Sequence, residues 1–274
     1  MTRYAVCLFL LLSASGLPAQ QSMEFLPDGN LPRLLIDPLE PQMGVRLMGV
    51  SRSASRFGTG VEWEANFGHM IPFVRLSGTT ERGVTLGVQG GVFGRFSFET
   101  RKRDLISADW IFALPLFIID GHNFVRIRYR HISSHLGDDY INRFNVAPEG
   151  YLRDAIGVLV YREVVNGVGL YGGGNAAFNV DPDTNNIRRL ALTGGIELNR
   201  YSVWGRDFYG GADVYLDQDM NWRPRVNLHI GERLTHTSGR NLRFVGELLF
   251  GPSPQGEFRR RNATLWKLGL IVDL

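Results

Sequence analysis

Residues 84–98 read VTLGVQGGVFGRFSF and alternate between two kinds of side chain. The even-numbered positions carry valine, leucine, phenylalanine or glycine, whereas Thr85, Gln89 and Arg95 stand at odd positions. Side chains of a β-strand point alternately to opposite faces, so this pattern predicts a strand with one apolar face and one largely polar face. The same alternation recurs in residues 61–67, 190–199, 208–216, 225–230 and 242–250. The chain is therefore predicted to be all-β.

Three features of these runs favour a membrane barrel over a soluble β-sandwich. Many runs reach about ten residues, which lets a tilted strand cross a bilayer, whereas soluble strands average about five or six. Arginine and acidic residues recur on the polar face, as in a closed lumen where opposite charges pair. The last residues, Lys267–Leu274, resemble the terminal strand of bacterial outer-membrane barrels. A closed barrel also leaves no unpaired strand edge in lipid.

These features predict a transmembrane antiparallel up-and-down β-barrel in the bacterial outer membrane, formed by residues 43–274. About twelve or thirteen strands can be placed, and because an even number is usual we expect about twelve. The count depends on residues 59–78, where Gly68–Pro72 fits either a turn or a bulge within one strand. The resemblance of the terminal strand implies the barrel-assembly machinery as a partner.

The first residues have the features of a secretory signal peptide. Arg3 precedes an apolar stretch, and small residues follow up to a cleavage position near Ala19. The signal peptide is therefore predicted to cover residues 1–19. It contains the single cysteine, Cys7, so the mature chain is expected to form no disulfide. Residues 20–42 are rich in proline and are expected to form an extended segment that lies in the periplasm or plugs the barrel.

The composition excludes several other classes of protein. Of the 274 residues, 44% are hydrophobic and 21% are charged, which is too apolar for a disordered chain and too polar for a bundle of membrane helices. The longest apolar run, residues 111–119, is interrupted by Pro115 and is far shorter than the roughly 20 residues of a membrane-spanning helix. A net charge of +3 without a segregated basic patch argues against nucleic-acid binding. The sequence suggests no cofactor.

Loop lengths predict the orientation of the barrel, since periplasmic turns are short and external loops are long. Residues 121–123 and 165–167 form tight connections, whereas residues 136–150 and 251–261 are long. The strand at 124–134 is therefore expected to run outward and to end at the external leaflet.

Residues 126–140, RIRYRHISSHLGDDY, hold the densest cluster of reactive side chains. Alternation places Arg126, Arg128 and Arg130 on one face, which must be the lumen because a charge facing the bilayer core costs roughly 2–4 kcal/mol. His131 and Ser133 then project toward lipid. Their spacing lets the imidazole take the serine proton, as serine nucleophile catalysis requires.

A third group must orient the imidazole. Asp154 on the next strand shares a face with Ile156 and is the best candidate, and Asp138 and Asp139 are alternatives from the loop.

The His131-x-Ser133 pair on the outside of a barrel resembles the catalytic pair of outer-membrane phospholipase A and of the lipid A deacylase barrel. Both cleave acyl esters from lipids of the outer leaflet. The resemblance implies that His131 is the base, Ser133 the nucleophile and an outer-leaflet lipid the partner. Both families place asparagine directly after the serine, where this chain has Ser134, and Asp154 is farther from His131 than the acid is in either family.

A longer resemblance is to an uncharacterised bacterial family of outer-membrane barrels. Its marks are Phe25-Leu-Pro-Asp-Gly29, Asp37-Pro-Leu-Glu-Pro-Gln42 and the run from His131 to Asp139. This resemblance implies a fold and a location, and no activity.

Other interpretations of the cluster lead to different functions. Ser133, His135 and Asp138 could cap the strand end while His131 lies at the bilayer interface, in a structural or transport barrel plugged by luminal charges and the N-terminal segment. A wider pore lined by the arginine row could select anions. Ser134, His135, Asp138 and Asp139 are candidate binding residues. A metal site built from His131, His135, Asp138 and Asp139 is a further alternative, although the histidine spacing is not specific for zinc.

Overall fold

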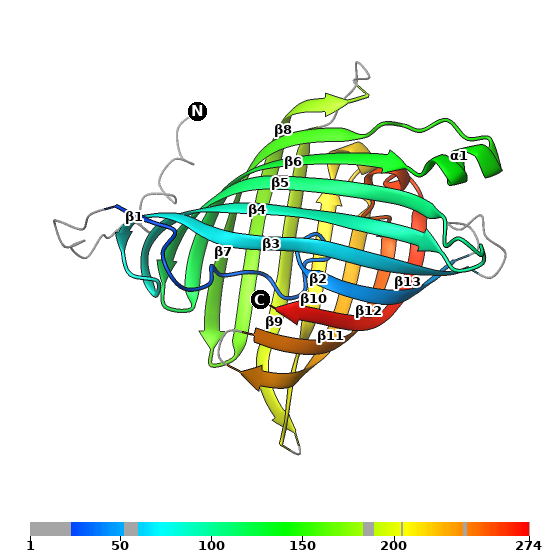
Figure 1. Ribbon diagram of the computed structural model, residues 1–274. Coiled ribbons are helices and arrows are strands. Elements are labelled where there is room, and N and C mark those ends of the chain that lie inside the picture. The colour runs from blue at the N-terminus through cyan, green and yellow to red at the C-terminus, as the bar shows by residue number, and fades with distance from the viewer. Residues whose placement is uncertain (1–22, 52–59, 183–188, 204, 238–239, 274) are drawn as a thin grey trace.

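Twelve long antiparallel strands close into a barrel in the computed structural model, which describes residues 23–51, 60–182, 189–203, 205–237 and 240–273 (Figure 1). The predicted signal peptide lies outside the described residues. The strands are β2 (Met43–Val50), β3 (Val61–Gly78), β4 (Arg82–Ser97), β5 (Leu105–Asp120), β6 (Asn123–Leu136), β7 (Leu152–Val165), β8 (Val168–Asp181), β9 (Leu190–Val203), β10 (Arg206–Asp217), β11 (Pro224–Thr237), β12 (Arg240–Pro252) and β13 (Asn262–Asp273). The predicted fold class and strand number are confirmed.

Each strand pairs with its sequence neighbours, and β13 pairs with β2 to close the barrel. The doubtful region at Gly68–Pro72 is part of a single strand, β3, whose register against β4 shifts between Pro72 and Val74. Proline lacks the N–H that a regular ladder needs, so an irregularity at this position is expected. A two-residue strand, β1 (Glu24–Phe25), adds to the same region of β3.

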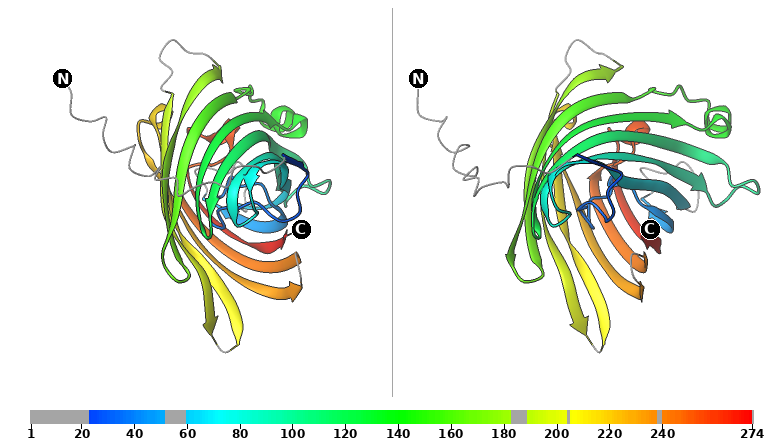
Figure 2. Two further views of the ribbon diagram at one scale, coloured as in Figure 1. Left: turned by 90° about the vertical axis from the view of Figure 1, so that its left-hand side faces the viewer. Right: turned by 60° about the vertical axis from the view of Figure 1, so that its left-hand side comes forward.

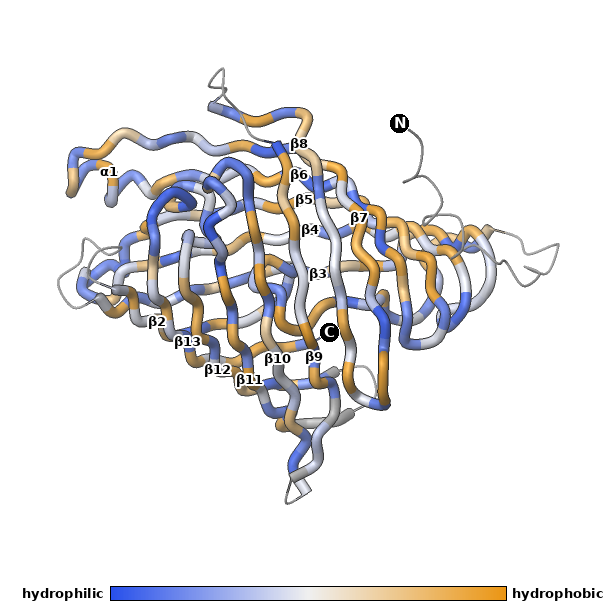
Figure 3. The backbone as a smooth tube through the Cα atoms, turned by 180° about the vertical axis from the view of Figure 1, so that it is seen from behind, coloured by the Kyte–Doolittle hydropathy of each residue, from blue (hydrophilic) through white to orange (hydrophobic). Residues whose placement is uncertain are grey.

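The apolar face of the barrel is outside and the charged face is inside. Arg46, Arg126 and Arg243 are among the most completely buried side chains, whereas Ile127, Ile156 and other large apolar residues are exposed on the exterior. Alternating hydrophobic and hydrophilic positions are visible along the strands in Figure 3. Because charge is costly on a lipid-facing surface, this arrangement suits an apolar membrane environment. No helix in the described ranges is long and apolar enough to cross a membrane.

The connections divide the barrel into a short-turn end and a long-loop end. Tight turns at Gly121 and Gly167 have positive φ angles of 60° and 77°, which glycine adopts without strain. The long connections at the opposite end contain α1 (Asp138–Phe144), η1 (Gln218–Met220) and η2 (Gly256–Phe258). β6 runs from the short-turn end toward the long-loop end. By the usual arrangement of such barrels, the short-turn end is assigned to the periplasm.

The N-terminal segment before β2 fills part of the lumen (Figure 2). Leu34 and Ile36 are 2% and 1% exposed, and the backbone N–H groups of Leu35 and Ile36 donate to Glu197 on β9. Asn227 on β11 donates its side-chain amide to the Ile36 carbonyl, at 2.8 Å. We call residues 31–42 the plug.

At the long-loop end, the connection between β12 and β13 folds into the barrel mouth. Gly256 donates its N–H to Asp109 on β5 at 3.0 Å, and Gln255 accepts a hydrogen bond from Arg95 on β4. Phe258 is buried against Tyr140 of α1. The lumen is thus occupied from both ends.

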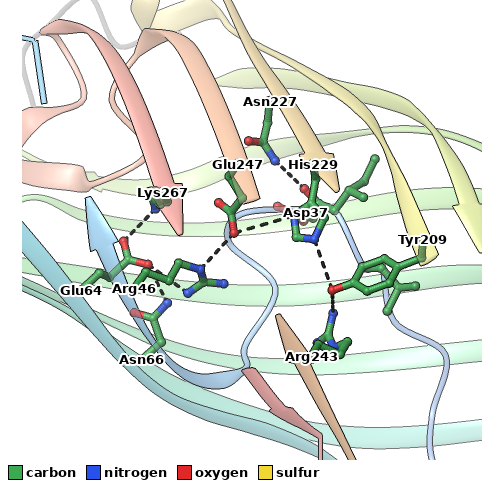
Figure 4. A network of polar contacts seen from close by, with 12 residues as sticks. Asp37, Arg46, Glu64, Asn66, Tyr209, Asn227, His229, Arg243, Glu247 and Lys267 are labelled. Atoms are coloured by element: carbon green, nitrogen blue, oxygen red, sulfur yellow. Dashed lines mark hydrogen bonds and ion pairs between the residues drawn. The ribbon is translucent and has the colours of Figure 1, made fainter. Parts of the chain in front are cut away.

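A chain of buried ion pairs joins the strands at the closure of the barrel (Figure 4). Arg46 on β2 contacts Glu64 on β3 at 3.1 Å and Glu247 on β12 at 3.0 Å. Lys267 on β13 reaches the second oxygen of Glu64 at 2.8 Å. Each charge has an opposite partner, which buried ions need in order to offset their desolvation.

Candidate active site on the barrel exterior

His131 and Ser133 lie on the outer face of β6, near its long-loop end. His131 is the cross-strand neighbour of Phe112 on β5 and of Asp154 on β7, and Ser133 lies beside Trp110. Trp110 and Phe112 are 56% and 43% exposed on the exterior. Exposed aromatic side chains of this kind are typical of the membrane interfaces of such barrels. The predicted orientation of Arg126, Arg128 and Arg130 toward the lumen is confirmed.

Asp154 holds the imidazole of His131. The Nδ1 atom of His131 lies 2.8 Å from Oδ1 of Asp154, and the half-buried ring leaves 31% of its side-chain surface exposed. An ionised carboxylate only accepts hydrogen bonds, so the proton of the neutral imidazole is on Nδ1. The Nε2 atom then carries the free lone pair that a general base requires.

Two residues not predicted from the sequence hold Asp154 in turn. The Tyr129 hydroxyl donates to Oδ1 at 2.8 Å, and the Asn179 side-chain amide donates to Oδ2 at 2.7 Å. The β7–β8 register shifts between Asp154 and Ala155, so that β8 accommodates Phe178 as an extra residue beside Asn179. Bulges of this kind re-aim side chains. Strict alternation gives no signal for such a bulge, whereas the shared face of Tyr129 and His131 was visible in the sequence.

Ser133 is paired differently from the sequence-based interpretation. Its Oγ lies 2.8 Å from Nε2 of His135, and no hydrogen bond joins it to His131 among the described contacts. The physical reason is that His131, Ser133 and His135 occupy successive positions on one strand face, so the serine stands between two imidazoles. The serine hydroxyl can turn toward either ring by changing one side-chain torsion.

The neighbouring Ser134 points into the lumen and is completely buried, so it is absent from the exterior site. Its hydroxyl donates to Asp109 and accepts the Glu257 N–H at 3.0 Å, which fastens the η2 loop to β6. This placement corrects the interpretation of Ser134 as a binding residue next to the nucleophile.

Asp138 and Asp139, the loop alternatives for orienting His131, lie in the exposed first turn of α1, and no described hydrogen bond joins either of them to His131. Acidic residues in this position favour the helix N-terminus electrostatically. No group of three or more potential ligands gathers around a metal position in the described part of the chain. His131, His135, Asp138 and Asp139 are thus not gathered around one position in the described part of the chain.

Residues 18–272 match the model of a family described as Protein of unknown function (DUF1207). The chain belongs to this family. No curated protein matches the sequence significantly. The match covers nearly the whole barrel, and it agrees with the family resemblance of the segments at Phe25, Asp37 and His131.

Two solved structures of outer membrane phospholipases show the same fold. The outer membrane phospholipase dimer of Salmonella typhi with bound calcium has a TM-score of 0.63 and 12% identity, covering 90% of this chain and 95% of that chain. The Escherichia coli outer membrane phospholipase A also has a TM-score of 0.63 and 12% identity, covering 91% and 95%. With these two structures, the protein is an outer-membrane β-barrel. The KdgM porin in complex with oligogalacturonate is a weaker match, with a TM-score of 0.47 and 8% identity, covering 84% of this chain and 98% of that chain.

Proposed function

We propose that this barrel hydrolyses acyl esters of outer-leaflet lipids, with Ser133 as nucleophile, His131 as general base and Asp154 as the group that orients the base. The observation that supports this most is the 2.8 Å hydrogen bond between Asp154 and His131 on the lipid-facing side of the barrel. A carboxylate in that position is costly unless it is fully hydrogen-bonded. The three donors around Asp154 supply this, and they leave one imidazole nitrogen free.

The reaction begins when the Ser133 hydroxyl turns from His135 to Nε2 of His131. Its Oγ attacks the ester carbonyl carbon while the proton moves to Nε2, and Asp154 stabilises the resulting imidazolium. The tetrahedral intermediate collapses, the C–O bond to the alcohol breaks, and the alcohol leaves with the proton from Nε2. Water then attacks the acyl-serine with the same base, which releases the fatty acid and restores Ser133.

The position of the site suits this substrate class. Lipid ester bonds lie between the headgroups and the acyl chains, which is the level marked here by Trp110 and Phe112. A transport function through the lumen is less favoured, because the plug and the η2 loop occupy the interior.

The test is release of fatty acid from phospholipid vesicles and, separately, from lipopolysaccharide by the purified full-length barrel. The wild type is expected to release fatty acid from at least one of the two, and Ser133→Ala and His131→Ala are expected to lower the rate by about 10²-fold or more. Ser202→Ala and His122→Ala are matched controls at the exposed short-turn end and should retain the wild-type rate. The proposal would be overturned if the wild type released no fatty acid from either lipid. It would also be overturned if Ser133→Ala and His131→Ala released fatty acid at the wild-type rate.

His135→Ala identifies which imidazole is the base. If His131 is the base, as proposed, this variant keeps most of the activity, because His135 only shares a hydrogen bond with the serine hydroxyl in the resting state. Loss of activity in His135→Ala combined with retention in His131→Ala would assign the base to His135 and reject the role of the Asp154–His131 pair.

A further inference from the structure

A small cavity in the lumen is lined by an unusual number of guanidinium groups. Its volume is about 50 Å³, and its charged lining consists of Arg126, Arg128, Arg130, Arg225, Asp37 and Asp213. Three of the four arginines come from β6 and the fourth from β11, across the barrel.

Two of these arginines have their counter-charge in the plug. Arg126 contacts both oxygens of Glu40, at 2.9 and 3.0 Å, and Arg128 reaches the same carboxylate at 3.4 Å. The Asp213 carboxylate accepts hydrogen bonds from Tyr171 and Thr193. Asp37 accepts the Leu39 N–H at 2.9 Å, and the charge of Asp213 also interacts with Arg225. Neither carboxylate forms a direct ion pair with Arg130 or Arg225 among the described contacts.

Arg130 and Arg225 make no direct contact of this kind with a carboxylate in the described part of the chain. They are 9% and 5% exposed, yet neither donates a hydrogen bond nor forms an ion pair with any residue in the described ranges. The Arg225 guanidinium lies over the ring of Tyr215, 4.4 Å from its centroid, and interacts electrostatically with Asp213 without a direct ion pair in the described part, while its Nε is buried without a hydrogen-bond partner. Both arginines also line a second cavity of about 50 Å³, toward Tyr151 and Pro254. The two guanidinium groups thus border both cavities.

We propose that Arg130 and Arg225 bind a small inorganic oxyanion, phosphate or sulfate, in the lumen. The planar guanidinium forms paired hydrogen bonds to two oxygens of such an anion, and a tetrahedral oxyanion can serve two guanidinium groups at once. The space suits an ion of a few heavy atoms, since one water needs about 10–15 Å³ by the same measure. A bound anion connects β6 with β11 beside the plug and compensates two buried charges.

The experiment measures phosphate binding to the purified full-length barrel in detergent micelles by equilibrium dialysis with radiolabelled inorganic phosphate, at constant ionic strength. The wild type is expected to bind phosphate saturably, and sulfate is expected to compete. Arg130→Gln and Arg225→Gln should weaken binding at least tenfold. Arg82→Gln removes an exposed arginine at the short-turn end and should bind as the wild type does.

Thermal unfolding provides a second readout on the same variants. Phosphate should raise the unfolding temperature of the wild type more than that of Arg225→Gln. The variant serves as the control for the general stabilising effect of phosphate on proteins. Without oxyanion, Arg225→Gln should unfold near the wild-type temperature, since Arg225 makes no hydrogen bond or direct ion pair in the described part that the variant would lose. Absence of saturable phosphate binding by the wild type, unchanged binding in Arg225→Gln, or equal competition by chloride would overturn the proposal.

Discussion

At the scale of single residues, Asp154 is the most informative side chain of the barrel. It accepts hydrogen bonds from His131, Tyr129 and Asn179, all on the outer side of the β6–β8 surface. A purely structural polar cluster could fix the strand end with fewer groups. This arrangement instead fixes the tautomer and ring orientation of a histidine that stands two residues from a serine.

Asp154→Asn tests this role. An amide at this position can donate to Nδ1 and favour the wrong tautomer, so the turnover rate for fatty acid release is expected to fall by about 10²-fold or more with little change in KM. Steady-state kinetics on lipid micelles measure both constants. The matched control is Asp120→Asn, which changes an exposed carboxylate in the β5–β6 turn. Wild-type turnover by Asp154→Asn would show that the carboxylate does not orient a catalytic base.

Ser134 provides the contrasting prediction, because it follows Ser133 directly but faces the lumen. Ser134→Ala removes the bonds to Asp109 and to the Glu257 N–H, so it should cost about 1–3 kcal/mol of stability while fatty acid release stays near the wild-type rate. Thermal unfolding and the lipid assay on the same sample measure the two effects. Loss of fatty acid release by Ser134→Ala without loss of stability would contradict this prediction and would indicate that Ser134 takes part in catalysis.

The sequence predicts part of this site and leaves out another part for physical reasons. The luminal row of Arg126, Arg128 and Arg130 determines which face is outside, and this places His131 beside Asp154 on neighbouring strands. The roles of Tyr129 and Asn179 depend on a bulge in β8, which alternation does not reveal. The sequence-based prediction paired Ser133 with His131, but spacing alone does not distinguish His131 from His135, because both are two residues from Ser133 along the strand.

At the scale of elements, the carboxylate of Glu40 joins the plug to the barrel wall through Arg126 and Arg128. Burial favours the neutral form of Glu40, but Arg126 and Arg128 outweigh it and hold the pKa of this carboxyl below its usual value. The stabilisation is therefore fully present above pH 4.5, the unshifted pKa, and is lost as the pH falls through the lower pKa of the folded state.

Glu40→Gln is expected to destabilise the plug by up to about 3–5 kcal/mol, because it leaves Arg126 and Arg128 without their counter-charge. In the wild type, amide hydrogen exchange at Leu34–Leu39, corrected for intrinsic rates, should accelerate as the pH is lowered below 4.5. The variant should exchange faster at neutral pH and show little of this pH dependence. Equal protection in both proteins at neutral pH would mean that the ion pairs do not hold the plug.

At the scale of the whole molecule, the plug and the η2 loop occupy the interior of the barrel, and the polar cluster around His131 and Asp154 lies on the exterior. The fold, the strand number and the inward orientation of the charges follow from alternation and strand length, since a single period of two fixes both faces. The filling of the lumen depends on long-range contacts such as Glu197 with Leu35 and Gly256 with Asp109, which no local pattern encodes.

A filled lumen predicts that the wild-type barrel gives no steady ion conductance in planar bilayers. A variant lacking residues 31–41 should conduct more than the wild type, because the plug no longer occupies the short-turn half of the lumen. Steady, voltage-independent conductance by the wild-type protein would contradict the closed interior and favour a transport role.

The most direct test of the proposed chemistry is covalent labelling of the nucleophile. A fluorophosphonate carrying a long alkyl chain reacts with an activated serine, and mass spectrometry of peptides locates the modified residue. Ser133 is expected to be labelled in the wild-type barrel in lipid, and His131→Ala is expected to lose the label while His122→Ala keeps it. A wild-type barrel that remains unlabelled at Ser133, or a label that persists in His131→Ala, would contradict the assignment of an Asp154–His131–Ser133 catalytic site.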